Sequence, residues 1–196
     1  MSTAWKQTGA PGAAILSIAD AKTHLRVTHS DDDGYIDNLV SAATTYIETV
    51  TGKQLINATY TYKLSGFPYD RELVLPVAPL QSVSSVQYED SNGSTQTLSS
   101  SNYDVDADSE EPRIVLVPTE YWPTTEANRH HAVTVTFIAG YGSAASDIPE
   151  DAVHACRLLV THWYENREAV VDGRKPETLP FGVDPLLDGL KSGSLF

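Results

Sequence analysis

Hydrophobic residues recur along this chain with two different periods, and the change of period separates helical from β segments. After Asp33 the apolar positions follow the i, i+3, i+4, i+7 spacing of an amphipathic helix, and Gly52 is a suitable residue to end it. This spacing predicts a long helix with one buried face. Its apolar residues are Tyr35, Ile36, Leu39, Val40, Ala43, Tyr46, Ile47 and Val50.

Two further segments have helical spacing. Ser17, with Asp20 three positions later, resembles a capping box and predicts a short helix that ends near Arg26. A third helix is predicted after Pro149, a residue suited to a first helical turn, and Gly173 is placed to close it. The apolar stripe of this third helix is Val153, Cys156, Val160, Trp163 and Tyr164.

From Leu55 to Gly140 the period changes to two, which is typical of β-strands. The segments "TYTYKL", "RIVLVP" and "AVTVTFIAG" are strand candidates, and "SVQYEDSNGSTQTL" predicts a hairpin around Asn92-Gly93. We expect a mostly antiparallel β module of about five or six short strands, with a longer polar loop at "SSSNYDVDADSEEP".

The predicted fold class is therefore α+β. A helical core of three main helices is built from residues 15–54 and 147–173, and the β module, residues 55–146, is inserted into it. Residues 1–14 are small, Gly-rich and aperiodic, so we expect a flexible N-terminal arm.

The last segment, residues 174–196, has three prolines and three glycines after Arg174 and no sustained period. It cannot form a core of its own, but its apolar residues are spread along a flexible backbone, as in a docking arm. We expect it to be extended and to bind a partner. The apolar residues are Leu179, Phe181, Leu186, Leu187, Leu190, Leu195 and Phe196.

Composition and net charge argue against several classes of function. The hydrophobic fraction of 41% is typical of a globular protein. The net charge of -13 repels phosphate and argues against a basic reader of DNA or RNA. A single cysteine, Cys156, excludes an intramolecular disulfide framework. The first twenty residues fit neither a signal peptide nor a membrane span, so we expect a soluble protein made inside the cell.

Three consecutive aspartates in "HSDDDGYID" raise the question of a calcium site. An EF-hand loop with Gly34 at its sixth position would place His29 at the first position and Val40 at the twelfth, where a bidentate carboxylate is required. The cluster also precedes the long helix directly, where carboxylates can accept backbone N–H groups and favour the helix dipole. We predict a helix cap formed by Asp31, Asp32 and Asp33.

A second acidic cluster lies in the predicted polar loop, residues 104–111. Its carboxylates could hold a divalent cation, or they could simply be solvated, and the sequence leaves both interpretations open. The cluster consists of Asp104, Asp106, Asp108, Glu110 and Glu111.

The other candidate catalytic groups have weaker signals. The pairs His130/His131 and His154/His162 lack the i, i+4 spacing of a zinc pair. Cys156 lies on or beside an apolar helix face, as an inert buried thiol does. Glu165, Arg167 and Glu168 fit a polar helix face with ion pairs better than a catalytic set. There is no G-x-S-x-G elbow, phosphate-binding loop or dinucleotide fingerprint. We expect neither an enzyme nor a cofactor.

Taken in order, four segments resemble the head-tail connector family, the adaptor or head-completion proteins of long-tailed double-stranded DNA phages and gene-transfer particles. The segments are "SIADAKTHLRV", "DDDGYIDNLVSAATTYIETVTGKQL", "LPVAPLQSVSSVQYED" and "VTFIAGYGSAASDIPEDAVHACRLLVTHWYENREAVV". The resemblance covers about residues 15–172. One departure is "LPVAPL", where Val77 and Ala78 replace the basic character of many relatives.

The resemblance implies a structural protein of the virion neck, made in the host cytoplasm. Its partners would be copies of itself in a ring, usually of twelve, the portal protein above, and a stopper or tail-completion protein below. DNA would pass through the ring without sequence-specific binding, and no membrane would be involved. We add two hypotheses: excess carboxylates face the channel, because basic side chains would retain phosphates, and the C-terminal arm docks on the portal.

Two alternative functions are also compatible with the sequence. One is a small metal-dependent hydrolase that uses the acidic loop at 104–111, and the other is a monomeric β-rich binding module. The oligomeric state before assembly and the surfaces that face portal, lumen and tail do not follow from the sequence.

Overall fold

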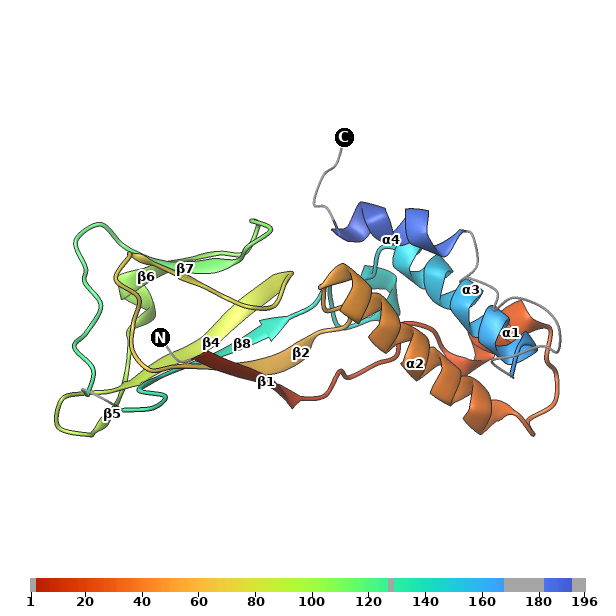
Figure 1. Ribbon diagram of the computed structural model, residues 1–196, viewed down its shortest axis with the longest axis horizontal. Coiled ribbons are helices and arrows are strands. Elements are labelled where there is room, and N and C mark those ends of the chain that lie inside the picture. Colours follow the sequence, from red (N-terminus) through yellow and green to blue (C-terminus); the bar gives the residue numbers. More distant parts are fainter. Residues whose placement is uncertain (1–2, 127–128, 168–181, 192–196) are drawn as a thin grey trace, which may run out of the picture. The chain divides into compact units, whose positions relative to one another are not determined.

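The computed structural model describes residues 3–126, 129–167 and 182–191 (Figure 1). The chain is α+β and forms two compact units. We call the first, Met1–Gly12 with Asn57–Tyr141, the β unit, and the second, Ala13–Ile56 with Gly142–Phe196, the helical unit. Among the described residues no helix is long and apolar enough to cross a bilayer. The helices are α1 (Ile18–Leu25), α2 (Asp33–Thr51), α3 (Glu150–Glu165) and α4 (Val183–Lys191).

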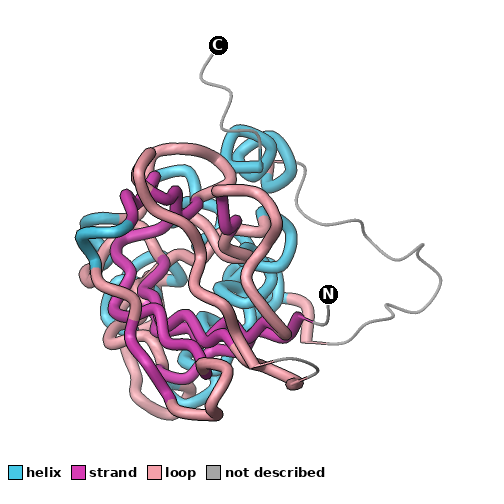
Figure 2. Tube along the Cα trace, turned by 90° about the vertical axis from the view of Figure 1, so that its left-hand side faces the viewer, coloured by secondary structure: helices cyan, strands magenta, loops and turns pink. Residues whose placement is uncertain are grey.

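The β unit contains two antiparallel sheets, joined by the long loops drawn in pink in Figure 2. The larger sheet has the strand order β1-β2-β8-β4-β5, and the smaller has the order β3-β7-β6. The strands are β1 (Thr3–Gly9), β2 (Ala58–Leu64), β3 (Glu72–Val74), β4 (Leu80–Glu89), β5 (Thr95–Thr97), β6 (Tyr103–Asp106), β7 (Arg113–Leu116) and β8 (Val133–Ala139).

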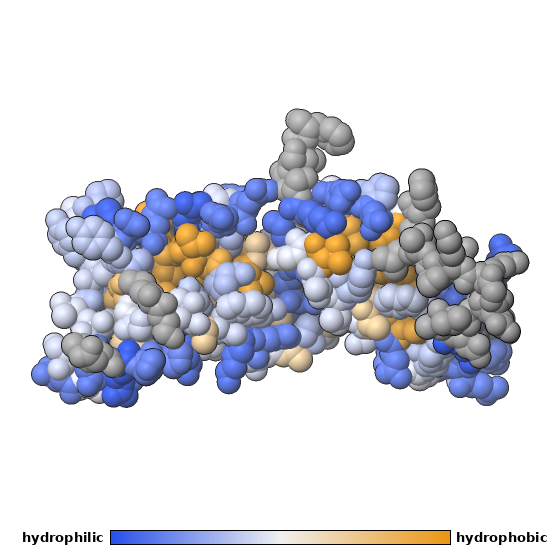
Figure 3. Space-filling model, in the orientation of Figure 1, coloured by the Kyte–Doolittle hydropathy of each residue, from blue (hydrophilic) through white to orange (hydrophobic). Residues whose placement is uncertain are grey.

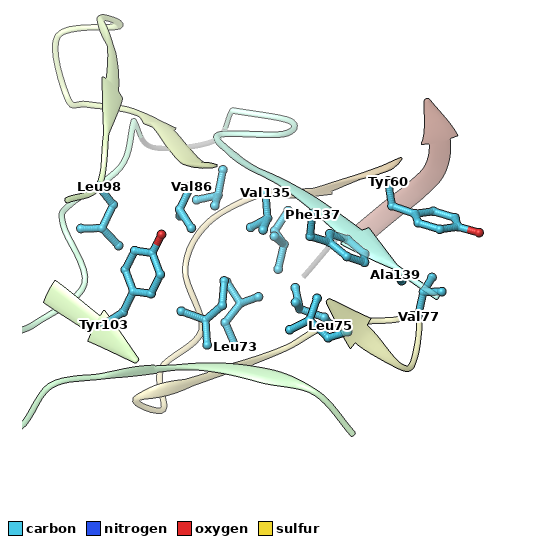
Figure 4. Close-up of a cluster of buried hydrophobic side chains, with 14 of the residues drawn as sticks. Tyr60, Leu73, Leu75, Val77, Val86, Leu98, Tyr103, Val135, Phe137 and Ala139 are labelled. Atoms are coloured by element: carbon cyan, nitrogen blue, oxygen red, sulfur yellow. The ribbon is translucent and has the colours of Figure 1, made fainter. Parts of the chain in front are cut away.

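Apolar side chains between the two sheets form the core of the β unit (Figure 4). Alternate residues of β8 point into it, and Val133, Val135 and Phe137 are fully buried. The ring of Tyr60 stacks on that of Phe137, with ring centroids 5.6 Å apart. Leu73 and Tyr103 contribute from the smaller sheet. The period of two in the sequence therefore marks the buried face of strands such as β7 and β8.

The β unit differs from expectation in three ways. Residues 3–9 are not a flexible arm: they form β1, which pairs with β2 along the edge of the larger sheet. The segment 58–139 contains seven strands, β2–β8, where about five or six were expected. The predicted polar loop is partly ordered, because Tyr103–Asp106 forms β6 and pairs with β7. The predicted hairpin is confirmed between β4 and β5, with Gly93 at φ 77° in its turn.

The helical unit begins as the sequence predicts. The hydroxyl of Ser17 accepts a hydrogen bond from the backbone N–H of Asp20 at 3.0 Å and caps α1. Gly52, at φ 68°, ends α2 in the left-handed conformation. The buried residues of α2 keep the predicted spacing and pack against α3. They are Ile36, Val40, Ala43, Ile47 and Thr51.

The C-terminal segment contains a helix that the sequence analysis did not predict. Val183–Lys191 forms α4, which packs against both α3 and α2. Val183 and Leu187 are fully buried there. The prediction that the whole arm is extended is therefore wrong for these nine residues. Gly173, predicted to close the third helix, lies outside the described residues, and α3 itself ends at Glu165.

Candidate functional site

The three aspartates of the "DDD" cluster have separate roles at the start of α2. Asp32 occupies the N-cap position, but its side chain makes no capping hydrogen bond. Asp33 is the first helical residue, and its carboxylate accepts a 2.6 Å hydrogen bond from the ammonium of Lys22 on α1. Asp31 is exposed, with His29 at 3.9 Å. The predicted capping hydrogen bond is thus absent at Asp32, because its carboxylate has other partners.

Those partners come from the end of α3. The phenol of Tyr164 donates a 2.5 Å hydrogen bond to the Asp32 carboxylate, and the guanidinium of Arg167 lies 3.4 Å from the same oxygen. Arg167 also lies over the rings of Tyr35 and Tyr164, at 4.7 and 5.2 Å from their centroids. We call Asp32, Tyr35, Tyr164 and Arg167 the helix-end cluster. It fastens the C-terminal end of α3 to the N-terminal end of α2.

The helix-end cluster has a definite electrostatic consequence. The hydrogen bond from Tyr164, followed by the positive charge of Arg167, lowers the pKa of Asp32 below its ordinary value. The same hydrogen bond raises the pKa of Tyr164, because the phenol must remain protonated to donate it. Arg167 follows the end of α3 at Glu165, so it does not lie on the helix face expected for "YENRE"; its ion-pair partner among the described residues is Asp32.

The acidic segment 104–111 does not gather its carboxylates into a metal site within the described residues. Asp106 accepts hydrogen bonds from the backbone N–H and the hydroxyl of Ser109, and these lower its pKa together with nearby Arg113. Arg113 also donates a 2.8 Å hydrogen bond to Glu72. Asp104, Asp108, Glu110 and Glu111 are exposed. The most enclosed carboxylate of the cluster is thus occupied by protein donors.

Cys156 is fully buried on α3, and burial raises the pKa of its thiol to about 12. A thiol with this pKa is almost entirely protonated at neutral pH, so it is a poor nucleophile. The described residues contain no group of three or more His, Cys, Asp or Glu side chains able to hold a metal ion.

The predicted docking residues divide into three groups. Leu187 is fully buried against the helical unit, and Leu186 and Leu190 are half-buried on α4. Leu179, Phe181, Leu195 and Phe196 lie outside the described residues. Two aromatic residues of the β unit, Tyr69 and Tyr121, are almost fully exposed. They lie in loops, so no periodic pattern in the sequence predicts their exposure.

Comparison with known proteins identifies the chain. The head completion protein family matches residues 14–173. Among solved structures, a chain from the virion of a native gene transfer agent particle has 26% sequence identity and a TM-score of 0.77, with 98% of this chain and 97% of that chain covered. None of the curated protein sequences matches this chain.

Two other structures share the fold over the same 98% of this chain and 97% of theirs, each with 24% identity. One is from the neck of an empty gene transfer agent particle computed with C6 symmetry, with a TM-score of 0.80. The other is from the neck of a native particle computed with C12 symmetry, with a TM-score of 0.78. The chain therefore belongs to the head completion protein family, and it is a structural head-tail connector, not an enzyme.

Proposed function

We propose that this protein assembles as a ring of twelve copies in the neck of a virion, between the portal and the stopper or tail, and extends the channel through which DNA passes. The observation that carries this proposal is the agreement over almost the entire chain with proteins of gene transfer agent particles, two of them from necks computed with C6 and C12 symmetry. Each copy acts through its shape, because the role requires no catalytic group.

A reconstruction of the mature particle tests this proposal directly. We expect twelvefold density for this chain directly below the portal. Density for the chain elsewhere in the particle, or a neck that lacks it, would contradict the ring. Mass measurement of the purified chain with and without portal protein gives an independent result, because copies that are monomeric in solution can assemble on a portal template.

We further propose that the C-terminal residues 174–196 attach the ring to the portal, with α4 as the part that holds the arm on its own subunit. The buried positions of Val183 and Leu187 support this division, since these side chains cannot contact a partner while α4 remains packed. Contact with the portal then falls to the residues on either side of α4 and to its exposed face. Twelve such arms would act together through effective concentration.

The packing of α4 determines which deletion can test the arm without disturbing the fold. Removal of residues 176–196 would expose the surface of α2 and α3 that α4 covers, so it would not leave the fold intact. Deletion of residues 192–196 alone keeps α4. We expect this shorter deletion to retain the melting temperature and to lose copurification with the portal. Normal portal binding by the shortened chain would overturn the proposed role of these five residues.

The acidic balance of the chain fits a channel wall, because lysine and arginine contacts to DNA phosphates would retard the genome. We propose that the outer face of the smaller sheet is one of the surfaces that face the DNA. Glu72 and Asp104 are exposed there, and both pair with Val115 in the strand register. A reconstructed lumen lined mainly by lysine and arginine would contradict this proposal.

A further inference from the structure

Two loops of the β unit present tyrosines that are almost fully exposed. Tyr69 lies between β2 and β3, and Tyr121 lies between β7 and β8. The two residues are 102% and 82% exposed, more than any other large hydrophobic residue that the structure describes. We call Tyr69 and Tyr121 the tyrosine knob. The face drawn in Figure 3 is mostly hydrophilic, and aromatic residues such as tyrosine are enriched at the cores of protein interfaces.

The residues next to the knob hold its two loops together. The rings of Phe67 and Trp122 stack with centroids 4.7 Å apart and an interplanar angle of 7°. The indole N–H of Trp122 donates a 2.7 Å hydrogen bond to the backbone carbonyl of Asp70. Trp122 adjoins Tyr121, and Asp70 adjoins Tyr69, so both tyrosines extend from one fixed base.

A second bridge joins the same two loops. The guanidinium of Arg71 donates hydrogen bonds to the backbone carbonyls of Leu116, at 3.2 Å, and Val117. Phe67 also packs on Tyr88 of β4, with ring centroids 5.8 Å apart. The backbone at both tyrosines is thus held in place before binding, which reduces the entropy cost of forming an interface.

Two carboxylates, those of Asp70 and Glu120, lie beside the knob together with one guanidinium, that of Arg71, which is hydrogen-bonded to backbone carbonyls, so the net local charge is negative. Asp70 is exposed and Glu120 is half-exposed, and neither carboxylate forms an ion pair within the described part of the chain. A partner surface should therefore combine apolar area for the rings with positive charge for these two carboxylates.

The helical unit carries a surface of that kind. A wide, open groove of about 670 Å³ is lined by α1 and by the residues that follow it. We call it the α1 groove. Its apolar lining includes Ile18, which is 36% exposed, and its basic residues are Lys22 and Arg26. Ala19 and Val27 add further apolar area.

The two basic residues of the α1 groove are not equivalent. Lys22 is paired with Asp33, so its charge is already compensated. Arg26 ends α1 in the left-handed conformation at φ 58° and is exposed. Its guanidinium has no ion pair among the described residues, so it is available to a carboxylate or to the face of a tyrosine ring.

We propose that the tyrosine knob of one copy docks in the α1 groove of the next copy around the ring. This inference rests on the proposed ring. A closed ring of more than two copies needs two different surfaces that fit each other, and the knob and the groove are such a pair on one chain. Tyr69 and Tyr121 supply the apolar contact, and Asp70 faces Arg26.

Photo-cross-linking in assembled particles tests the contact. A p-benzoylphenylalanine residue replaces Tyr69 in one variant and Tyr121 in another, and irradiation is followed by mass spectrometry. We expect a product of twice the chain mass, linked to residues 18–28 of a second copy. The matched control places the same group at Thr95, an exposed residue of β5, and should not label that segment.

A cross-link to a different protein, to another segment of the second copy, or within one chain would overturn the knob contact. So would the absence of any cross-link in particles that contain the ring. These results would contradict the contact between copies but not the ring itself. Particles that assemble without this chain in the neck would instead overturn the ring, and the contact with it.

A charge exchange provides an independent test. We expect Arg26→Glu to reduce the incorporation of the chain into particles at least tenfold, while the melting temperature of the free chain stays the same. Adding Asp70→Arg to the same chain should restore incorporation, because every interface then has the reversed pair. Lys53→Glu, a charge reversal outside the groove, is the control. Equal incorporation of the Arg26→Glu chain and the wild type would contradict the contact.

Discussion

Tyr164, near the end of α3, donates a 2.5 Å hydrogen bond to Asp32, at the start of α2, across 132 positions of sequence. Arg167 lies 3.4 Å from the same carboxylate and over both neighbouring tyrosine rings. Two helix ends are thus joined by a network in which the carboxylate must be ionised. The lowered pKa of Asp32 and the raised pKa of Tyr164 are two results of one bond.

Replacing Tyr164 with phenylalanine should raise the pKa of Asp32 toward the ordinary aspartate value of about 3.9, because the largest cause of its depression is removed. An NMR titration of the Asp32 carboxyl carbon measures this change. Tyr35→Phe is the matched control, since the hydroxyl of Tyr35 donates to the carbonyl of Trp163 and not to Asp32. An unchanged Asp32 pKa in Tyr164→Phe would refute the assignment.

The same bond predicts a dependence of stability on pH. A carboxyl group with a lowered pKa in the folded state stabilises the fold above its unfolded pKa, near 3.9, and this contribution is lost as the pH falls through the lower folded value. The melting temperature of the wild type should therefore fall more steeply on acidification below about pH 4 than that of Tyr164→Phe. Parallel curves for the two chains would show that Asp32 contributes nothing.

The attachment of α4 can be tested at Leu187, which is fully buried. Leu187→Ala should cost about 2–5 kcal/mol where the contact is part of the cooperative fold, and it should speed amide hydrogen exchange throughout α4. Leu190→Ala is the comparison, because Leu190 is only half-buried and should cost less. Equal effects of the two substitutions would mean that α4 does not pack through Leu187.

Position 140 requires glycine for two reasons: the backbone has a positive φ, and there is no space for a Cβ atom. It has φ 141°, and a Cβ atom placed there would lie 2.6 Å from the backbone nitrogen of Asn57. Gly140→Ala should therefore destabilise the protein by about 2–4 kcal/mol, measured by denaturant unfolding. Gly34→Ala, at an exposed position of α2 with open space around it, should instead stabilise by about 0.5–1 kcal/mol. A mild effect at Gly140 would contradict the close approach.

Cys156 should be inert in the native protein. Its thiol is buried and its pKa is about 12, so the thiolate is scarce even at pH 8. A maleimide or disulfide reagent should label the unfolded chain at least a hundred times faster than the folded one. Rapid labelling without denaturant would show that α3 opens easily or that the thiol is accessible.

Local signals in the sequence were enough to predict the boundaries that depend on neighbouring residues. Ser17 caps α1 through Asp20, three positions away, and Gly52 ends α2 because it adopts positive φ without a steric penalty. The hairpin at Asn92-Gly93 is predictable for the same reason. In each case the information lies within a few residues of the feature.

Other features depend on distant partners. β1 has six exposed residues among its seven and no buried alternation, and its structure comes from pairing with β2, more than fifty positions away. The cluster around Asp32 likewise requires the end of α3 to fold back on the start of α2. Neither the exposed edge strand nor the long-range hydrogen bond has a signature within a single segment.

The helix α4 could have been predicted. Val183, Leu186, Leu187 and Leu190 follow the i, i+3, i+4, i+7 pattern, and Pro185 falls in the first turn, where its missing N–H has no consequence. Because Pro185 and Gly189 give the segment a composition typical of a linker, its helical spacing was not recognised. In the same way, Tyr103 and Val105 alternate with aspartates in β6, and the acidic residues suggested a loop.

The β unit is composed of two stretches of chain, 1–12 and 57–141, so the backbone passes between the units three times. This limits how a chimera could be made. Grafting residues 57–141 from a relative would bring in β2 but leave behind its neighbour β1, whose Trp5 packs on Tyr60 with ring centroids 5.9 Å apart. A transplant that respects the architecture must carry the first twelve residues along with the central segment.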